Sequence, residues 1–477
     1  MARLMLNVSH SFAWLQLMAR ASGLVKRSLY LVAATAGLAM AGCTDTPDEP
    51  DGEGAIRGIH AIAGLSDVAF LIEEVSIGNA TYQTATPFTV FDSLVYDFNF
   101  DFTSPVTGER TRLATAELSV RPGQNYTFVL GGTTSAPTLR ILEQTTRVFD
   151  AGGSVLELWF GNLSTQIGSI DIYVGAPGFD PAAAMPLASA LDSDSFSGIT
   201  EVEASEVEFV ATRAGDPADI LIRSQALTLL AGDTSLVNLY DAADETTGEY
   251  AFVISGDLNG ARLVDQTAPT QLQFIHASQP SPAVDVFVGD TLGTPVVSNL
   301  TFGMISDVLV IPEADDATEV TLISTPTGQP GTELTSDDAS FSDASTNLLV
   351  ITGAQADDTL GVASSPRNRR PLTDAARLGL FNAIQNTELI DVFVLEPDEM
   401  LEGATPRGIN VGPSLDLTQS IRAPGDYVLY ITNSDDDSVL LGPMAFSLAA
   451  GDIRQLVFVD TVDPNVPAVI DFDLRLP

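Results

Sequence analysis

Short apolar runs separated by turn-forming residues dominate the chain. Between residues 267 and 363 the runs lie at 271–276, 283–288, 296–300, 305–311, 319–323 and 347–352, and they are enriched in Val, Ile, Phe and Thr. Pro, Gly, Asp, Asn and Ser fill the intervals. Many short strands with turns between them are typical of a β-sandwich.

Segments with helical spacing are nearly absent. The best candidates, residues 181–191 and 373–378, are short, and we expect them to lie in connections between strands. The pattern therefore gives no support to long βαβ units or to the nucleotide sites that accompany them.

One motif recurs four times along the chain. Its clearest copy is FIHASQPSPAVDVFVGD at residues 274–290, and its Asp returns at positions 67, 171, 285 and 391. A tight turn and an apolar run follow the Asp at 120–132, 229–240 and 448–460, and the third copy has Ser and Asp in place of Gly-Asp within 340–353. Two landmarks at one offset indicate four tandem repeats.

We therefore predict an all-β chain of four tandem Ig-like or transthyretin-like antiparallel β-sandwich domains. Their expected ranges are 55–150, 151–266, 267–363 and 374–477, with a linker at 364–373. A signal peptide at 1–42 and a flexible acidic tether at 43–54 precede them. We expect the domains to be joined end to end.

The first 42 residues have the features of a lipoprotein-type signal. Basic residues at 20, 26 and 27 precede an apolar run at 29–41, which is too short for a membrane span of about twenty residues. The run ends in Met40-Ala41-Gly42-Cys43, which resembles the bacterial lipobox, so we predict lipidation of Cys43 and a membrane anchor. Thr44, where Asp would mark inner-membrane retention, favours the outer membrane.

Charge restricts the partners. The four basic residues of 1–42 leave 17 arginines against 63 acids in the rest of the chain, a net charge of −46. Such a surface repels nucleic acid and anionic headgroups, so we expect no nucleic-acid partner. Cys43 is the only cysteine, which excludes an internal disulfide.

The repeat also decides how to interpret its polar residues. One position of the motif is His in two repeats and Asn in the other two. A catalytic base or a metal ligand would not alternate with Asn, whereas His and Asn both have a short side chain that donates and accepts hydrogen bonds. We therefore predict a structural role, in which these residues satisfy backbone groups where a strand ends and the Asp binds loop amides or a neighbouring strand. The positions in question are His60, Asn162, His276 and Asn382.

These motifs resemble a known family. The core HASQPSPAVDVFVGD, the apolar strand at 308–311 and the later run DASTNLLV are similar to the bacterial domain-of-unknown-function family 4397. The resemblance is close over 270–363, moderate over 375–477 and weak over 55–150 and 152–266. It implies tandem β-domains in secreted or surface-attached proteins, and it implies no catalytic residues.

Motifs of known active sites are absent from the sequence. No nucleophile elbow, Walker loop, HExxH or paired-Cys zinc motif occurs, and no Lys follows residue 42. We predict no enzyme activity, no catalytic, cofactor-binding or metal residues, and no cofactor. Acidic clusters in predicted turns are suitable for weak calcium binding or are solvated turns. They lie at 192–195, 313–316, 337–338 and 435–437.

Residues 364–371 (SSPRNRRP) reverse the local charge. Flanking Pro and Ser predict a linker, and two interpretations remain. The arginines lie in a solvated joint and pair with nearby acids, or they form a docking site for an anionic polymer or an acidic neighbour.

Two functions remain open at this stage. The first is a lipid-anchored, non-catalytic array at the bacterial surface with a structural, adhesive or ligand-binding role, whose ligand would be a surface glycan or a protein. The second is an envelope glycan-processing enzyme that uses an unrecognised carboxylate pair. Two facing acids in a cleft of one domain would favour the second function.

Replacing Cys43 by Ser should release the protein from the membrane, because the thiol that would carry the lipid is lost. Fractionation of cells that express the full chain measures the effect, with Thr44→Ser as the matched control. Unchanged membrane association of Cys43→Ser would contradict the anchor.

Overall fold

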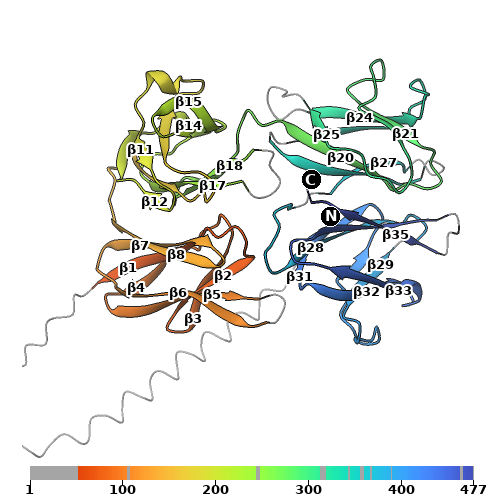
Figure 1. Cartoon of the computed structure of the whole chain (residues 1–477), viewed down its shortest axis with the longest axis horizontal. Coiled ribbons are helices and arrows are strands. Elements are labelled where there is room, and N and C mark those ends of the chain that lie inside the picture. Colours follow the sequence, from red (N-terminus) through yellow and green to blue (C-terminus); the bar gives the residue numbers. More distant parts are fainter. Residues whose placement is uncertain are drawn as a thin grey trace, which may run out of the picture. The chain divides into compact units, whose positions relative to one another are not determined.

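The computed structural model describes residues 52–475 except 105–107, 243–247, 312–318, 342–343, 355–358, 366–367, 388, 462 and 464–465. Within these ranges the chain is all-β, and its strands form eight sheets (Figure 1). One single-turn 3-10 helix, Pro181–Ala183, lies among them. In the same ranges no helix has the length and apolar character that crossing a membrane requires.

The sheets pack in pairs around four apolar cores, which define four sandwiches. The first sandwich contains the sheets β4-β1-β7-β8 and β3-β2-β5-β6. Its strands are β1 Glu53–His60, β2 Asp67–Ile72, β3 Val75–Thr81, β4 Thr89–Asp92, β5 Val95–Thr103, β6 Arg110–Ser119, β7 Gln124–Thr133 and β8 Ala136–Thr145.

The second sandwich follows the same order with additional short strands. Its main sheets are β12-β9-β17-β18-β19 and β11-β10-β14-β15, with β13 beside β9 and β16 beside β14. Its strands are β9 Val155–Asn162, β10 Ile170–Gly175, β11 Ala188–Leu191, β12 Ser195–Phe196, β13 Thr200–Glu203, β14 Glu206–Arg213, β15 Asp216–Arg223, β16 Leu227–Thr228, β17 Thr234–Asp241, β18 Tyr250–Ser255 and β19 Gly260–Leu263.

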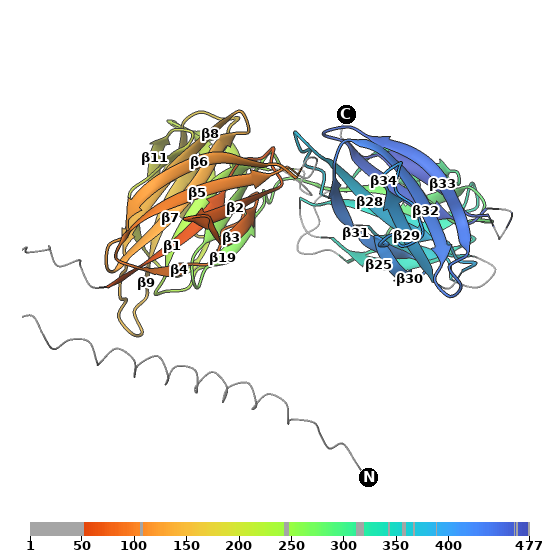
Figure 2. The ribbon, with the colours of Figure 1, turned by 90° about the horizontal axis from the view of Figure 1, so that it is seen from below.

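The third and fourth sandwiches repeat the first strand for strand, with sheets β23-β20-β26-β27, β22-β21-β24-β25, β31-β28-β34-β35 and β30-β29-β32-β33. Figure 2 shows strands β28–β34 of the fourth sandwich. The third has β20 Thr270–His276, β21 Val284–Val288, β22 Val297–Leu300, β23 Leu309–Ile311, β24 Glu319–Pro326, β25 Thr335–Ser340, β26 Thr346–Thr352 and β27 Gly361–Ser364. The fourth has β28 Ala376–Ala383, β29 Ile390–Leu395, β30 Gly408–Val411, β31 Leu415–Arg422, β32 Gly425–Asn433, β33 Val439–Leu448, β34 Ile453–Val459 and β35 Ala468–Asp473.

Strand pairing corrects the expectation of purely antiparallel sandwiches. In the first, third and fourth sandwiches the first strand pairs in parallel with the seventh, as β1 does with β7 and β20 with β26. The equivalent pairs β9–β17 and β28–β34 are also parallel. The reason is topological, because the chain crosses to the second sheet and back between these strands and returns in the original direction.

Alternating apolar residues place the cores as the sequence predicts. On β21, Val284 and Val286 are buried in the core of the third sandwich, and Val288 packs against it. The equivalent residues of β10 (Ile170, Ile172) and β29 (Ile390, Val392) are buried in their own cores. Period-2 alternation on the second strand is therefore confirmed.

Two further apolar clusters correct the expectation that the sandwiches are joined end to end. Val350 on β26 shares one cluster with Phe381 on β28 and Val457 on β34, so the third and fourth sandwiches pack through sheet faces. Val129 on β7 and Tyr240 on β17 share the other cluster, which joins the first and second sandwiches. The first and seventh strands thus lie in sheets that bury both faces, which explains their continuous apolar runs.

The two segments predicted as helices are not helical, apart from a single turn in the first. Of residues 181–191, only Pro181–Ala183 is helical, and Ala188–Leu191 forms β11. Residues 373–378 run into β28, where every residue is buried. Strand pairing overrides the local helical preference at both places, with β10 for residues 188–191 and with β31 and β34 for β28.

The turn before the seventh strand needs a left-handed residue. Gly123, Gly232 and Gly451 supply it with φ of 68°, 85° and 81°, and Ala344 takes this position in the third sandwich with φ of 53°. The carbonyl of the next residue, Ser345, accepts the N–H of Gln271 at 2.8 Å, as Asp233 does for Glu157 at 2.9 Å. Ala-Ser at 344–345, not Ser-Asp, therefore replaces Gly-Asp here.

Val457→Asp should lower the free energy of unfolding by about 3 kcal/mol or more, because it places an unpaired carboxylate between two sandwiches. Val439→Asp is the control, since Val439 on β33 is 50% exposed, and it should change the value by less than about 0.5 kcal/mol. Urea unfolding of the full chain measures both. Equal effects would contradict the buried face.

Candidate functional site

The polar residue that ends the first strand of each sandwich binds backbone, as the repeat predicts. At all four positions its side chain accepts a hydrogen bond from the N–H two residues later. The pairs are His60–Ile62 (3.3 Å), Asn162–Ser164 (3.3 Å), His276–Ser278 (3.3 Å) and Asn382–Ile384 (3.0 Å). Imidazole and carboxamide therefore perform the same hydrogen bonding.

The far ends of Asn162, His276 and Asn382 reach carbonyl groups across the crossing between sheets. Nε2 of His276 lies 2.9 Å from the carbonyl oxygen of Pro282. The Nδ2 group of Asn382 donates to the carbonyl oxygens of Val411 (3.1 Å) and Gly412 (2.9 Å). Buried backbone acceptors at the strand end are satisfied in this way.

Both imidazoles are held neutral. His60 and His276 are fully buried, and burial lowers the pKa of His60 to about 3, with a further contribution from Arg370. Burial also lowers the pKa of His276, against the effect of its bond to Pro282. A side chain that is closed off from solvent and uncharged near neutral pH is poorly placed for proton transfer to a ligand.

The recurrent Asp stabilises a β-bulge on the neighbouring edge strand. In three sandwiches one carboxylate oxygen accepts the N–H of a residue with a left-handed backbone, at the point where the strand register shifts. The pairs are Asp171–Ala190 (2.7 Å, φ 49°), Asp285–Asn299 (2.8 Å, φ 55°) and Asp391–Asn410 (2.8 Å, φ 53°). The predicted bond between the Asp and a neighbouring strand is confirmed.

A second loop is fixed by the same carboxylates. Asp171 accepts the N–H of Gly215 and Asp285 that of Gly328, both at 2.8 Å. Asp391 instead accepts the hydroxyl of Ser434 at 2.6 Å. Each carboxylate therefore ties two segments of its own sandwich together.

Asp67 in the first sandwich departs from this pattern. It is exposed and lines a hollow of about 320 Å³ together with Ser66, Asn79 and Asp101. The walls of the hollow partly desolvate its carboxyl group, which raises the pKa of Asp67, although Arg370 and Arg377 oppose the shift. Two carboxylates thus share one hollow, which is the arrangement named above as favouring a glycan-processing enzyme.

Asp101 is already engaged, however. Its carboxylate pairs with the guanidinium groups of Arg110 and Arg112, and its side chain is 1% exposed. Arg112 reaches both carboxylate oxygens, at 2.8 and 3.2 Å. A buried carboxylate held by two arginines is poorly suited to attack a substrate or activate water.

The acidic clusters lie in different settings. Asp435–Asp437 forms the predicted turn, where Asp436 accepts the N–H and hydroxyl of Ser438, bonds that lower its pKa. Asp337 and Asp338 lie on β25 rather than in a turn, which corrects that expectation. Asp194, between β11 and β12, pairs with Arg140 at 2.9 Å. The cluster at 313–316 lies outside the described residues, as does Cys43.

No three His, Cys, Asp or Glu residues within the described ranges gather as metal ligands. Calcium binding at the acidic turns stays a prediction.

The arginine segment is a buried joint, so neither interpretation from the sequence is right for Arg369 and Arg370. Both are less than a tenth exposed. Arg370 donates to the carbonyl oxygens of Ala63 and Leu65, the latter at 2.9 Å, and its guanidinium lies 4.8 Å from the ring centre of Tyr82. Carbonyl groups and an aromatic ring therefore lie against this cation.

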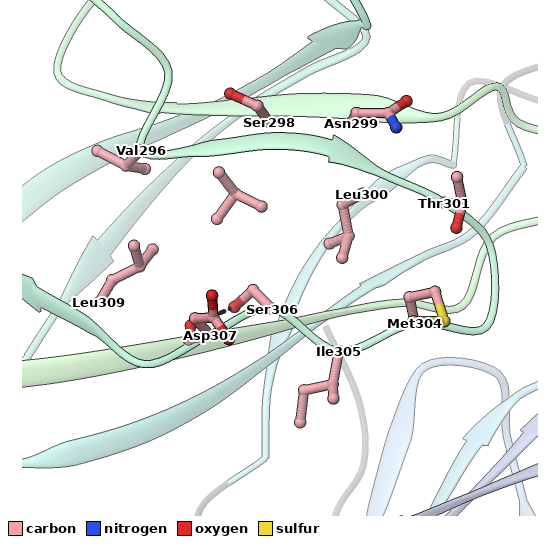
Figure 3. Close-up of a pocket in the computed structure, with 11 residues that line it drawn as sticks. Val296, Ser298, Asn299, Leu300, Thr301, Met304, Ile305, Ser306, Asp307 and Leu309 are labelled. Carbon is pink, nitrogen blue, oxygen red and sulfur yellow. Dashed lines mark hydrogen bonds between the residues drawn. The ribbon is translucent and has the colours of Figure 1, made fainter.

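A groove of about 420 Å³ opens in the third sandwich between β22 and β23, the end strands of its two sheets. Val297 and Leu300 line it and belong to the core of this sandwich, and Leu309 packs against that core. Figure 3 shows Leu300 and Leu309 pointing into the space between the two segments, while Ser298 and Asn299 point away. The groove therefore exposes part of the core.

The third and fourth sandwiches differ at this place. In the fourth sandwich Leu417 pairs with Leu380, and its Cδ2 would lie 2.3 Å from a Cβ on Gly408, so it fills this space. In the third sandwich Ser306 stands there. Its hydroxyl accepts the N–H of Phe274 at 2.9 Å and leaves the space open.

The sequence analysis missed Ser306 and its equivalents. Thr86 and Ser197 accept the N–H groups of Gly58 (2.9 Å) and Phe160 (3.1 Å) in the same way. A hydroxyl five or six residues after the third strand of the first three repeats is a weak signal, because Ser and Thr are common in every turn.

Comparisons with known proteins point to one family. A family model described as "Domain of unknown function (DUF4397)" matches residues 54–173 and 270–393, together about half of the chain. None of the curated proteins matches. Among solved structures, the Bacillus anthracis TIE protein is 10% identical over 82% of this chain and 68% of that chain, with a TM-score of 0.14, which carries no argument.

His60→Asn should reduce the acid sensitivity of the fold. The folded protein keeps His60 neutral down to a pKa of about 3, whereas the unfolded chain takes up a proton near pH 6.5. Acidification below that pH therefore favours unfolding, by about 1.4 kcal/mol per pH unit.

Urea unfolding at pH 7 and pH 5 measures the effect. The variant should lose about 2 kcal/mol less stability over this interval than the parent chain, because Asn does not titrate. The same pH dependence in both proteins would contradict a buried neutral imidazole.

Proposed function

Because the chain belongs to the DUF4397 family, a domain of unknown function, we propose its role from its own residues. It is a lipid-anchored protein of the bacterial cell envelope, held through Cys43. Its β-sandwiches form a non-catalytic array with a structural, adhesive or ligand-binding role. The outer membrane is the membrane that residue 44 favours.

One observation carries the proposal. The side chains with the most catalytic potential, His276 and Asp285 and their equivalents other than Asp67, are bonded to backbone groups of their own sandwich. Because these residues stabilise the fold, recognition of a ligand is left to the loops and the open strand edges.

We infer that the sandwiches are of the Ig-like or transthyretin-like kind. The support is the strand order, in which the first strand lies between the fourth and the seventh and the second lies between the third and the fifth. This order repeats in the first, third and fourth sandwiches. It suits an array whose units share one scaffold and differ at their edges.

The glycan-processing alternative has one observation in its favour, the hollow that contains Asp67 and Asp101. A carboxyl group with a raised pKa beside an ionised carboxylate is the pairing that glycosidases use. The two arginines on Asp101 argue against it. We therefore place this function second.

A panel of envelope glycans and surface proteins separates the two functions. The purified full chain should bind members of the panel without releasing new reducing ends. Reducing-end release that disappears in Asp67→Asn and persists in Asp97→Asn, an exposed acid on β5, would overturn the non-catalytic role. The assay reads bound ligand and product separately.

A further inference from the structure

The groove of the third sandwich has the construction of a strand-docking site. β22 and β23 end their sheets, and each has a single neighbouring strand, β21 and β20 respectively. End strands offer backbone groups that an extended segment of another chain can pair with. Between them lie side chains of the sandwich core, which such a segment would cover.

The lining accepts an apolar side chain. Val297 and Leu300 are 9% and 5% exposed at the floor, while Met304 and Val296 are 55% and 40% exposed at the rim. A volume of about 420 Å³ lies toward the small end of the range for ligand pockets, about 300–1,000 Å³. One large aliphatic or aromatic side chain is a suitable occupant.

Charge identifies the partner. Residues 267–363 contain thirteen Asp and Glu and neither Lys nor Arg, whereas the rest of the chain after residue 42 carries all seventeen arginines. Asp307, which is exposed, is the one acid among the residues that line the groove. The field around this sandwich attracts cations and repels anions.

We propose that the groove binds an extended, positively charged polypeptide segment, which pairs with an end strand and inserts one large apolar side chain between Leu300 and Leu309. This inference rests on the proposed ligand-binding role and gives it a partner class. A second copy of this chain is a poorer occupant, since its net charge of −42 would repel the acidic sandwich.

A labelled nine-residue peptide of alternating Lys and Val with a central Leu is the probe, and fluorescence anisotropy with the full chain is the measurement. Binding should weaken by about tenfold or more when Glu replaces Lys or when Ser replaces the central Leu, because charge and anchor are lost separately. Equal binding of the Glu peptide would overturn the proposal, as would the lack of any binding at millimolar peptide.

Ser306→Leu tests the groove itself, because it copies the closure by Leu417 in the fourth sandwich. It should abolish binding, whereas Ser306→Ala, which loses the hydroxyl and keeps the space, should bind like the parent. Thermal melting checks that both variants fold. If Ser306→Leu does not fold, Met304→Lys decides, since this exposed position then repels the probe while Met304→Ala does not.

Binding that survives Ser306→Leu in a folded protein, or survives Met304→Lys, would place the peptide elsewhere and overturn the proposal. Sedimentation of the parent chain tests whether a second copy of this chain occupies the groove. A dimer that Ser306→Leu dissociates would assign the groove to that second copy instead. Failure of peptide binding leaves the anchor and the absence of glycan turnover untouched, so the two proposals fail separately.

Discussion

Wherever the chain leaves the first strand of a sandwich for the opposite sheet, backbone N–H and C=O groups lose their partners in the ladder, and a buried unpaired group is costly. The residue at the strand end supplies the replacement bonds, through imidazole in His276 and carboxamide in Asn382. On the next strand, Asp285 accepts the N–H of Asn299 and so stabilises the bulge in which Asn299 has a left-handed backbone. The position of the second sheet over the first depends on these bonds, and so do the shape and edges of every sandwich.

The second constraint is that one sheet of each sandwich buries both faces. β28 has no exposed residue, because its inner face meets its own core and its outer face meets the third sandwich. Such a sheet contributes to two apolar clusters at once, so its strands couple neighbouring sandwiches energetically. The arginine joint adds a polar contact of the same kind, in which Arg370 reaches loop carbonyl groups far away in the sequence. The units of this chain are therefore not independent beads on a string.

Periodicity was enough to predict β20, β21, β22, β24 and β26, and alternation of His with Asn was enough to predict a structural role for both. β25 escaped because its sequence TSDDAS has turn composition, yet it lies at a sheet edge where Asp337 and Asp338 can remain solvated. The burial of Arg370 could not be predicted, because its partners are carbonyl groups of residues 63 and 65, which carry no side-chain signal. The groove could not be predicted either, since it depends on which residue near β23 in one sheet faces Val297 on β22 in the other.

The exchange of Leu417 for Ser306 has a consequence for how tandem copies diverge. Leu417 fills the space beside Gly408, whereas Val297 and Ser306 leave the equivalent place open. The edge strand of the third sandwich also pairs over a shorter stretch, 270–272 with 309–311, than its counterpart does along 376–382. After duplication, one copy can keep the side chain that fills this space and the packing between sandwiches can be kept, while another copy loses that side chain and gains a cavity. A new specificity can therefore arise from a few side chains at one sheet edge, within a strand order that the copies share.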